Sequence, residues 1–382
     1  MKSIKVGISV TYVPPTYIGG GETYIYYLSR ELTKLGVDIS IFTTPTLRTT
    51  EWDWSHAKFY ESKSIFNVRN TPVMPSLLSN MIKYSSYNVI HTAVPQGFAC
   101  DISALASSIR RKPLVITYHC DLIPLTGVLK AYSLLQRLFT LRLASKIIAT
   151  TRSYAETSAL LSSFMEKVAI VPLGADLPRF SYNERYRQEI KQKHGIAEGD
   201  KVVLFVGGLN YYHRFKRVDL LIRAIAELSQ YNDNICLIVV GEGELKSSLK
   251  ELAHNLHLQK SIFAGYVSNE DLPKYYCAAD LFVLPSLTRE EAFGIVLVEA
   301  AACGAIPVTF DIPGPGEVCK ALGGCVCHVG LEGEPLDSLA EAIAQLLNSD
   351  LHLRRMECQE KARSYSWSES AKKILQIYNE LV

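Results

Sequence analysis

The chain has 382 residues, which is long for one domain and typical of two. Hydrophobic residues make up 48% of it and charged residues 20%, the composition of a globular protein with an ample core. The formal net charge of +2 argues against bulk binding of nucleic acid, and no apolar run approaches the ~18 residues that cross a bilayer.

The N-terminal pattern is a strand, a glycine loop, a helix and a second strand. We predict the first strand over residues 4–13, the loop at Gly19-Gly20-Gly21, the helix over 22–35 and the next strand over 37–42. This order is typical of phosphate-binding units. The glycines alone are weak evidence, because turns use glycine for its tolerance of positive φ.

The nine cysteines are predicted to be reduced, small core residues. The apolar start of the chain is interpreted as a strand and not as a signal peptide, because Pro14-Pro15 interrupts it too soon. The run Cys325-Val326-Cys327-His328 has the wrong spacing for a zinc knuckle, and alternation along a strand explains it better. We therefore expect no metal.

A histidine follows one of the strands predicted in the N-terminal half. Strands are predicted over 88–91 and 113–118, with a helix over 98–110 between them, and residues 45–87 stay unassigned. His119-Cys120-Asp121 then stands at the carboxyl end of the second strand, where open α/β sheets place ligand contacts. A lone histidine is more often a structural hydrogen-bonding residue, and its place at a strand end offsets that expectation.

A cationic amphipathic helix is predicted over 125–144, with Lys130, Arg137 and Arg142. Such a helix could touch an anionic membrane surface. An ordinary packed helix whose cations reach solvent is favoured.

The remaining elements of the first half and the start of the second half follow in order. They are a strand at 146–149, a helix at 153–164, a strand at 168–171, a linker over 177–200 and a strand at 201–206. Gly207-Gly208 and a loop with Arg214 and Lys216 then precede an apolar helix over 218–228. A glycine turn and cations before a helix predict a diphosphate site.

The C-terminal half continues with the same alternation. Strands are predicted at 237–240 and 262–267, a helix at 269–278, a loop at Gly314-Pro315-Gly316-Glu317, and final helices at 338–347, 353–362 and 366–381.

The stretch from Pro285 to Val308 carries the most specific signal. An apolar strand runs into it, and a helix start follows, which offers free N–H groups to an anion such as a diphosphate. Two glutamates, Glu291 and Glu299, flank an almost wholly apolar run. A pair of this kind is usually a solvated helix face, but the apolar run and Phe293-Gly294, which lets a ligand approach the backbone, argue against that.

These residues resemble the GT4-type retaining glycosyltransferases of the GT-B fold. The family signature is a glutamate, seven residues and a second glutamate, with Phe-Gly inside, and 291–299 matches it with Ala292 as a mild departure. The resemblance covers nearly the whole chain, and it is strongest over 201–310 and weakest over 45–87.

The resemblance implies an α/β fold of two Rossmann-like doubly wound domains that face a cleft. It places residues 1–177 in an acceptor-side domain and 178–365 in a domain that binds the nucleotide sugar. The terminal helix, 366–382, crosses back to the first domain. The implied reaction is retaining, metal-independent transfer of a sugar from a nucleotide-diphosphate sugar to a hydroxyl acceptor, with that sugar as co-substrate and no other cofactor.

The resemblance also assigns the site residues. Glu291 and His119 are the catalytic candidates. The donor-binding candidates share positions in loops or at the helix start: Gly20, Gly21, Gly207, Arg214, Lys216, Tyr266, Val267, Phe293, Gly294, Ile295, Val296 and Glu299.

One position departs from the family, which has an arginine where this chain has Gly208. Arg214 is the predicted surrogate, because an arginine reaches several ångströms and pairs bidentately with phosphate. The departure keeps open a degenerate nucleotide-binding paralogue, or a partner subunit without transfer activity. A nucleotide-sugar 2-epimerase is a further alternative, which the 285–308 match disfavours.

The predicted partners are a nucleotide-sugar donor and a carbohydrate or lipid-linked acceptor, with no nucleic acid. The predicted location is the cytoplasm, with peripheral contact at the inner face of the membrane left open.

Overall fold

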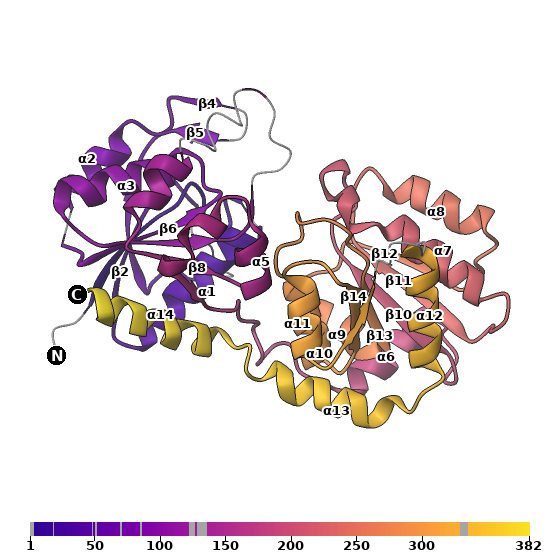
Figure 1. Ribbon diagram of the computed structural model, residues 1–382. Helices are drawn as coiled ribbons and strands as arrows, with labels where there is room; N and C mark the ends of the chain where they lie inside the picture. The colour runs from indigo at the N-terminus through magenta and orange to yellow at the C-terminus, as the bar shows by residue number, and fades with distance from the viewer. Residues whose placement is uncertain are drawn as a thin grey trace. The chain divides into compact units, whose positions relative to one another are not determined.

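The computed structural model describes residues 4–17, 19–47, 49, 52–68, 71–84, 86–121, 127, 136–328 and 335–382. The chain divides into two units, shown in Figure 1. Unit 1 is Met1–Gly174 together with Trp367–Val382, and unit 2 is Ala175–Ser366.

Unit 1 is built on a seven-stranded parallel sheet in the order β3-β2-β1-β6-β7-β8-β9. Its strands are β1 (Lys5–Ser9), β2 (Asp38–Thr43), β3 (Ala57–Glu61), β6 (Val89–Val94), β7 (Leu114–Tyr118), β8 (Lys146–Ala149) and β9 (Val168–Ile170). Every residue of β6 and β7 is buried, as in a sheet covered on both faces. A short antiparallel pair, β4 (Phe66–Val68) and β5 (Thr71–Val73), stands apart from this sheet.

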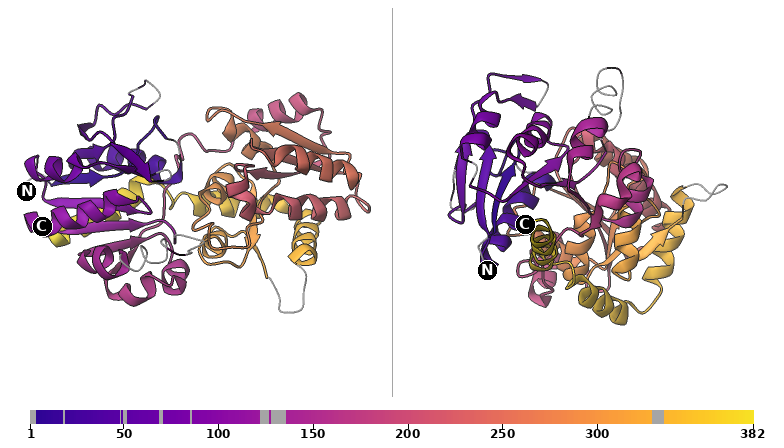
Figure 2. Two further views of the ribbon diagram at one scale, coloured as in Figure 1. Left: turned by 90° about the horizontal axis from the view of Figure 1, so that it is seen from above. Right: turned by 60° about the vertical axis from the view of Figure 1, so that its left-hand side comes forward.

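Helices cover the sheet of unit 1. They include α1 (Gly20–Lys34), α2 (Ser76–Lys83), α3 (Phe98–Arg110), α5 (Arg152–Thr157) and the last helix, α14 (Trp367–Leu381). The chain therefore returns to unit 1 at its end, where the yellow C-terminus lies in both views of Figure 2. Trp367 stacks on Tyr27 of α1 with ring centroids 5.5 Å apart, which fixes α14 against α1.

Unit 2 has a six-stranded parallel sheet in the order β12-β11-β10-β13-β14-β15. Its strands are β10 (Lys201–Val206), β11 (Ile235–Val240), β12 (Ser261–Gly265), β13 (Leu281–Leu284), β14 (Ile306–Phe310) and β15 (Cys325–Cys327). Its helices are α6 (Glu184–His194), α7 (Val218–Leu228), α8 (Lys246–Asn255), α9 (Leu272–Ala278), α10 (Ile295–Ala302), α11 (Pro315–Ala321), α12 (Pro335–Leu347) and α13 (Leu351–Ala362). Two parallel-sheet α/β units and a C-terminal helix confirm the predicted fold class.

Three predicted elements were wrong. The helix predicted over 153–164 breaks into α5 and the 3-10 helix η2 (Leu161–Lys167), because Ser158 is extended and its hydroxyl donates to Asp121 Oδ1 at 2.6 Å. Residues 177–200 contain α6 instead of a plain linker. The predicted loop at 314–317 opens α11, whose second residue is Gly316.

The region 45–87, left unassigned from sequence, contributes to the core of unit 1. Trp52 and Trp54 are buried, and both rings meet Tyr26 of α1 edge-on, with centroids 4.8 and 5.0 Å away. The helix predicted over 125–144 lies in part outside the described residues. Within its described part, residues 136–141 form a π-helix. Across the part of the chain that the structure describes, no helix combines the length and the apolar character needed to span a membrane.

Candidate functional site

The candidate site of unit 2 forms where β10 and β13 end. These strands are parallel neighbours, so the loops that follow them emerge at the same edge of the sheet. The loop after β10 leads to Lys216, and the loop after β13 carries Glu291. Lys216 Nζ and Glu291 Oε2 form an ion pair whose side chains are only 13% and 14% exposed. Two residues 75 positions apart in sequence are thus joined in a largely desolvated pair.

Helix α10 begins directly after this loop with a free N-terminus. Gly294 is its N-cap residue at φ +74°, where a Cβ would lie 3.0 Å from both Leu284 and Leu297. Only glycine combines that backbone conformation with this close packing. No side chain caps α10, so the N–H groups of its first residues, Ile295 and Val296, are directed at the loop as donors for an anion.

A second glycine holds the Glu291 loop in place. Gly314 precedes α11 at φ +98°, and a Cβ there would lie 2.1 Å from the carbonyl oxygen of Ala292. The backbone before α11 therefore packs directly on the residue that follows Glu291.

Glu299 lies inside α10 and is held by a tyrosine. Its Oε2 accepts a hydrogen bond from the Tyr276 hydroxyl at 2.9 Å. Burial raises the pKa of Glu299 to about 7, against the opposing effects of the Tyr276 hydrogen bond and of Arg179. Phe293, just before the helix, is buried. Glu299 can accept hydrogen bonds from hydroxyl groups most strongly in its ionised form.

Two side chains cover the glycine pair after β10. A Cβ on Gly207 would lie 3.1 Å from Lys216 Cδ, and a Cβ on Gly208 would lie 2.4 Å from His213 Nδ1. Both covering residues belong to the 3-10 helix η3 (Tyr211–Lys216). The missing side chain at position 208 therefore leaves a space that the His213 ring fills.

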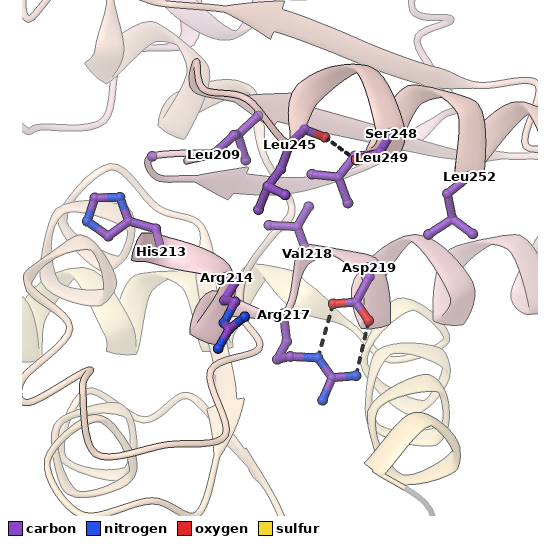
Figure 3. Close-up of a pocket in the computed structure, with 11 residues that line it drawn as sticks. Leu209, His213, Arg214, Arg217, Val218, Asp219, Leu245, Ser248, Leu249 and Leu252 are labelled. Atoms are coloured by element: carbon purple, nitrogen blue, oxygen red, sulfur yellow. Dashed lines mark hydrogen bonds and ion pairs between the residues drawn. The ribbon is translucent and has the colours of Figure 1, made fainter. Parts of the chain in front are cut away.

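Arg214, the predicted surrogate cation, is exposed and lines a pocket of about 310 Å³ between η3 and α8, which Gly208 and His213 also line. Figure 3 shows the His213 ring and the Arg214 side chain pointing in different directions. The pocket walls include Leu209, Leu245 and Leu249, and Arg217 at its edge pairs with Asp219 at 3.0 Å.

Tyr266 and Val267 follow β12, at the same edge of the sheet as the loops after β10 and β13. The Tyr266 side chain is 77% exposed. The described residues contain no group of three or more histidine, cysteine or acidic side chains that could hold a metal ion.

Unit 1 has its own cluster where β1, β6 and β7 end. A Cβ on Gly21 would lie 3.6 Å from Gln96 Nε2 and 3.9 Å from His119 Cδ2. Gly20 is the first residue of α1, one position before Gly21. Gln96 accepts a hydrogen bond from the Thr11 N–H at 2.9 Å. The sequence analysis did not single out Gln96, although it stands just past β6 as His119 stands just past β7.

His119 is a neutral imidazole in this cluster. Burial lowers its pKa to about 4. Its Nε2 atom is buried and has no hydrogen-bond partner among the described residues, and the ring meets Tyr24 edge-on at 4.8 Å. Asp121 differs, because its Oδ1 already accepts from the hydroxyls of Tyr118 at 2.7 Å and Ser158 at 2.6 Å. The His119 imidazole can therefore bind a ligand group, while the Asp121 carboxylate already holds the hydroxyls of Tyr118 and Ser158.

The structure brings the predicted residues together in two groups, each within one unit. Unit 2 unites Lys216 with Glu291 and places the start of α10 on the same loop. Unit 1 unites Gly21 with His119. The roles assigned to these residues stay predictions.

Two family models match the chain. The model described as Glycosyltransferase Family 4 matches residues 18–179, and the model described as Glycosyl transferases group 1 matches residues 186–365.

Relatives of this chain include the O-antigen chain mannosyltransferase C of Escherichia coli, 28% identical over 89% of this chain and 87% of that protein. Another is the D-inositol 3-phosphate glycosyltransferase of Corynebacterium glutamicum, 25% identical over 95% of this chain and 92% of that protein.

Solved structures share the fold. A glycosyltransferase from Rickettsia africae superposes with a TM-score of 0.78 at 18% identity, covering 100% of this chain and 99% of its own. Anabaena HepE in complex with UDP has a TM-score of 0.78 at 20% identity, covering 99% of this chain and 100% of its own.

Proposed function

Because the chain belongs to the glycosyl transferases group 1 family, we propose that it transfers a sugar from a nucleotide-diphosphate sugar to a hydroxyl acceptor and retains the anomeric configuration. The observation that carries this proposal is the Lys216–Glu291 pair beside the uncapped start of α10. It sets a cation, a helix N-terminus and a carboxylate within one loop cluster, which suits a diphosphate attached to a polyhydroxyl group.

The leaving group is a nucleoside diphosphate, whose charge grows as the sugar departs. Lys216 and the N–H groups of Ile295 and Val296 stabilise that charge, and such fixed electrostatic stabilisation is often the largest contribution to catalysis. When the donor phosphate pairs with Lys216, the Glu291 carboxylate is released from its ion pair. It can then accept hydrogen bonds from sugar hydroxyls beside the developing oxocarbenium ion. Glu299 accepts hydrogen bonds from the ribose hydroxyls.

The bond changes balance without a protein nucleophile. The bond between the anomeric carbon and the phosphate oxygen breaks, the acceptor oxygen bonds to the same carbon from the same face, and the acceptor proton passes to the leaving phosphate. This route is adopted by analogy with the family. His119, neutral near pH 7, orients the sugar or the acceptor by hydrogen bonding, and the cation and helix dipole make a metal unnecessary.

The acceptor class is proposed from the relatives. An O-antigen chain mannosyltransferase among them favours a growing carbohydrate or a lipid-linked sugar as acceptor. Such acceptors are met at the inner face of a membrane, which fits a cytoplasmic protein with peripheral membrane contact.

The first test is a donor screen. The UDP, GDP, ADP and dTDP sugars are compared by thermal shift, and release of nucleoside diphosphate is measured with and without acceptors. A true donor at ~100 times its Kd adds about 2.7 kcal/mol of stability. Stabilisation without turnover or product would instead favour a nucleotide-binding paralogue, and an epimerised sugar would favour a 2-epimerase.

Glu291→Gln tests the assignment of the site. The substitution keeps the size of the side chain and removes its charge, so transfer should fall by ~10²–10³-fold while nucleoside diphosphate binding persists. Glu290→Gln makes the same charge change one position earlier and should leave turnover near that of the native chain. Equal turnover in Glu291→Gln and the native chain would refute the role of Glu291.

A further inference from the structure

The space where the family carries an arginine is occupied in this chain by a histidine. Gly208 has no side chain, and the nearest atom to a Cβ built there is His213 Nδ1, at 2.4 Å, followed by His213 Cε1 at 3.0 Å. An amino acid with a side chain at position 208 would collide with this ring. The His213 ring can therefore occupy this space only because position 208 is a glycine.

Hydrogen bonds to the backbone N–H of His213 anchor this residue beside the glycine pair. The Asn210 side chain caps η3 by accepting from the His213 N–H at 3.1 Å, and the Asn210 carbonyl accepts from the same N–H at 2.9 Å. The ring of Phe215 meets the imidazole at 6.0 Å in an edge-on arrangement. A side chain with its backbone anchored in this way loses little further freedom when it binds a ligand.

The charges of the Lys216–Glu291 pair act on the His213 imidazole. Burial lowers the pKa of His213, Lys216 lowers it further, and Glu291 acts in the opposite direction. The ring is therefore neutral near pH 7 and within electrostatic reach of both partners. Within the part of the chain that the structure describes, its buried Nδ1 atom has no hydrogen-bond partner, which costs free energy unless a ligand supplies one.

We propose that His213 takes the place of the absent arginine at position 208 and binds the diphosphate of the donor through an imidazole N–H. The inference rests on the proposed function and goes further, because it names the residue that completes the phosphate site. Arg214 is a weaker candidate, since it is exposed and its side chain points in a different direction from the His213 ring that covers Gly208 (Figure 3).

A histidine in this role has a consequence that an arginine would not have. A bound diphosphate favours the protonated imidazole, so donor binding takes up a proton and becomes tighter as pH falls. Lys216 opposes this uptake, and Glu291 and the diphosphate favour it. Arginine stays charged throughout the accessible pH range and shows no such dependence.

The experiment measures the Kd of the nucleotide sugar selected by the donor screen, by calorimetry at pH 6.0 and 8.0. His213→Ala should weaken binding at pH 6.0 by ~10–100-fold, the range for a hydrogen bond to a charged group. Arg214→Ala tests the competing cation and should weaken binding less than His213→Ala does. Tyr212→Ala, at an 88% exposed residue of the same 3-10 helix, is the control and should stay within about twofold of the native chain. His213→Gln keeps an N–H donor without a titratable group, so it should bind better than His213→Ala and lose the gain at pH 6.0.

Gly208→Arg supplies the reciprocal test. Alone it should not tighten binding, because the His213 ring fills the space. Combined with His213→Ala it should recover most of the lost affinity, and this double variant should lack the dependence on pH that His213 contributes. Because Glu299 is common to all the variants, its own titration cancels in the comparison.

The outcomes separate this inference from the proposed function. Binding by the native chain that is unchanged in His213→Ala overturns the inference alone, and so does a loss confined to Arg214→Ala. Failure of the native chain to bind any nucleotide sugar overturns the proposed function and the inference together.

Discussion

Burial shifts the pKa values of two site residues in opposite directions, and both shifts favour the neutral form. The pKa of His119 falls to about 4, and that of Glu299 rises to about 7. At neutral pH, His119 therefore acts as a hydrogen-bonding group without charge, and Glu299 is close to half ionised. A ligand whose hydroxyls donate to Glu299 would favour its ionised form.

Glu299→Gln should change how stability depends on pH. The folded-state pKa of about 7 lies above the ordinary glutamate value of 4.5, so the folded chain holds this proton more tightly than the unfolded chain. The stabilising contribution is present below pH 4.5 and is lost as pH rises to 7. The free energy of unfolding should fall over this window by on the order of 1–3 kcal/mol more in the native chain than in Glu299→Gln. Thermal unfolding of the native chain and of Glu299→Gln at several pH values measures this difference. The same dependence of stability on pH in both proteins would contradict the prediction.

At the level of single residues, the sequence predicted Lys216 and Glu291 as site residues, but it predicted neither their ion pair nor the place of His213. Lys216 and Glu291 stand in recognisable motifs, so their meeting at one sheet edge could be anticipated. His213 covers Gly208 only because η3 turns the intervening residues back over the glycine pair. Spacing in sequence does not tell which side chain of such a short loop covers which glycine, and Arg214 was chosen for its charge.

At the scale of elements, the apolar helix α7 was predicted accurately and the strongly charged helix α6 was not. Helix α7 was predicted with the bounds 218–228 that it has. Helix α6 was missed, because it is mostly charged and buries little besides Ile190 and Lys191. The ends of α6 do carry the residues typical of helix ends, because Asn183 caps its start and Gly195, at φ +64°, follows its end.

Gly314→Ala tests whether the start of α11 positions the Glu291 loop. The new Cβ would meet the Ala292 carbonyl oxygen at 2.1 Å, so the loop must move, and donor affinity should fall although Gly314 has no side chain that could contact the donor. Strained backbone adds a cost of ~1–3 kcal/mol to stability. Donor Kd and thermal unfolding measure the two effects.

Gly195→Ala is the matched control for that variant. Its glycine also has positive φ, but a Cβ there would meet no atom within 4 Å. It should lose stability by ~1–2 kcal/mol and keep the donor affinity. Equal donor affinity in both variants would show that α11 does not position the loop.

At the scale of the whole molecule, the order of strands and helices along the chain indicated the α/β fold class. Each unit repeats strands, loops and helices in an α/β order, which leaves few topologies besides a doubly wound parallel sheet. What sequence periodicity does not show is that the final helix completes the other unit. That expectation came from family resemblance, and the contact surface of α14 explains it. Its buried side chains, Trp367, Ala371, Ile374, Ile377 and Tyr378, belong to the core cluster of unit 1.

Removal of residues 367–382 should therefore destabilise unit 1, although these residues follow unit 2 in sequence. Each large apolar side chain contributes roughly 1.5–3 kcal/mol on burial, so the helix contributes an amount comparable with the ~5–15 kcal/mol that stabilises a domain. The deletion also removes the Tyr378 hydroxyl, which forms a hydrogen bond with Nδ1 of His91 in β6. Hydrogen exchange should show lost protection in β1, β6 and α1 and native protection in β10, β11 and β13. Deletion of Val382 alone, which is 65% exposed, should change neither unit. Protection lost first in unit 2 would mean that α14 stabilises the molecule in another way.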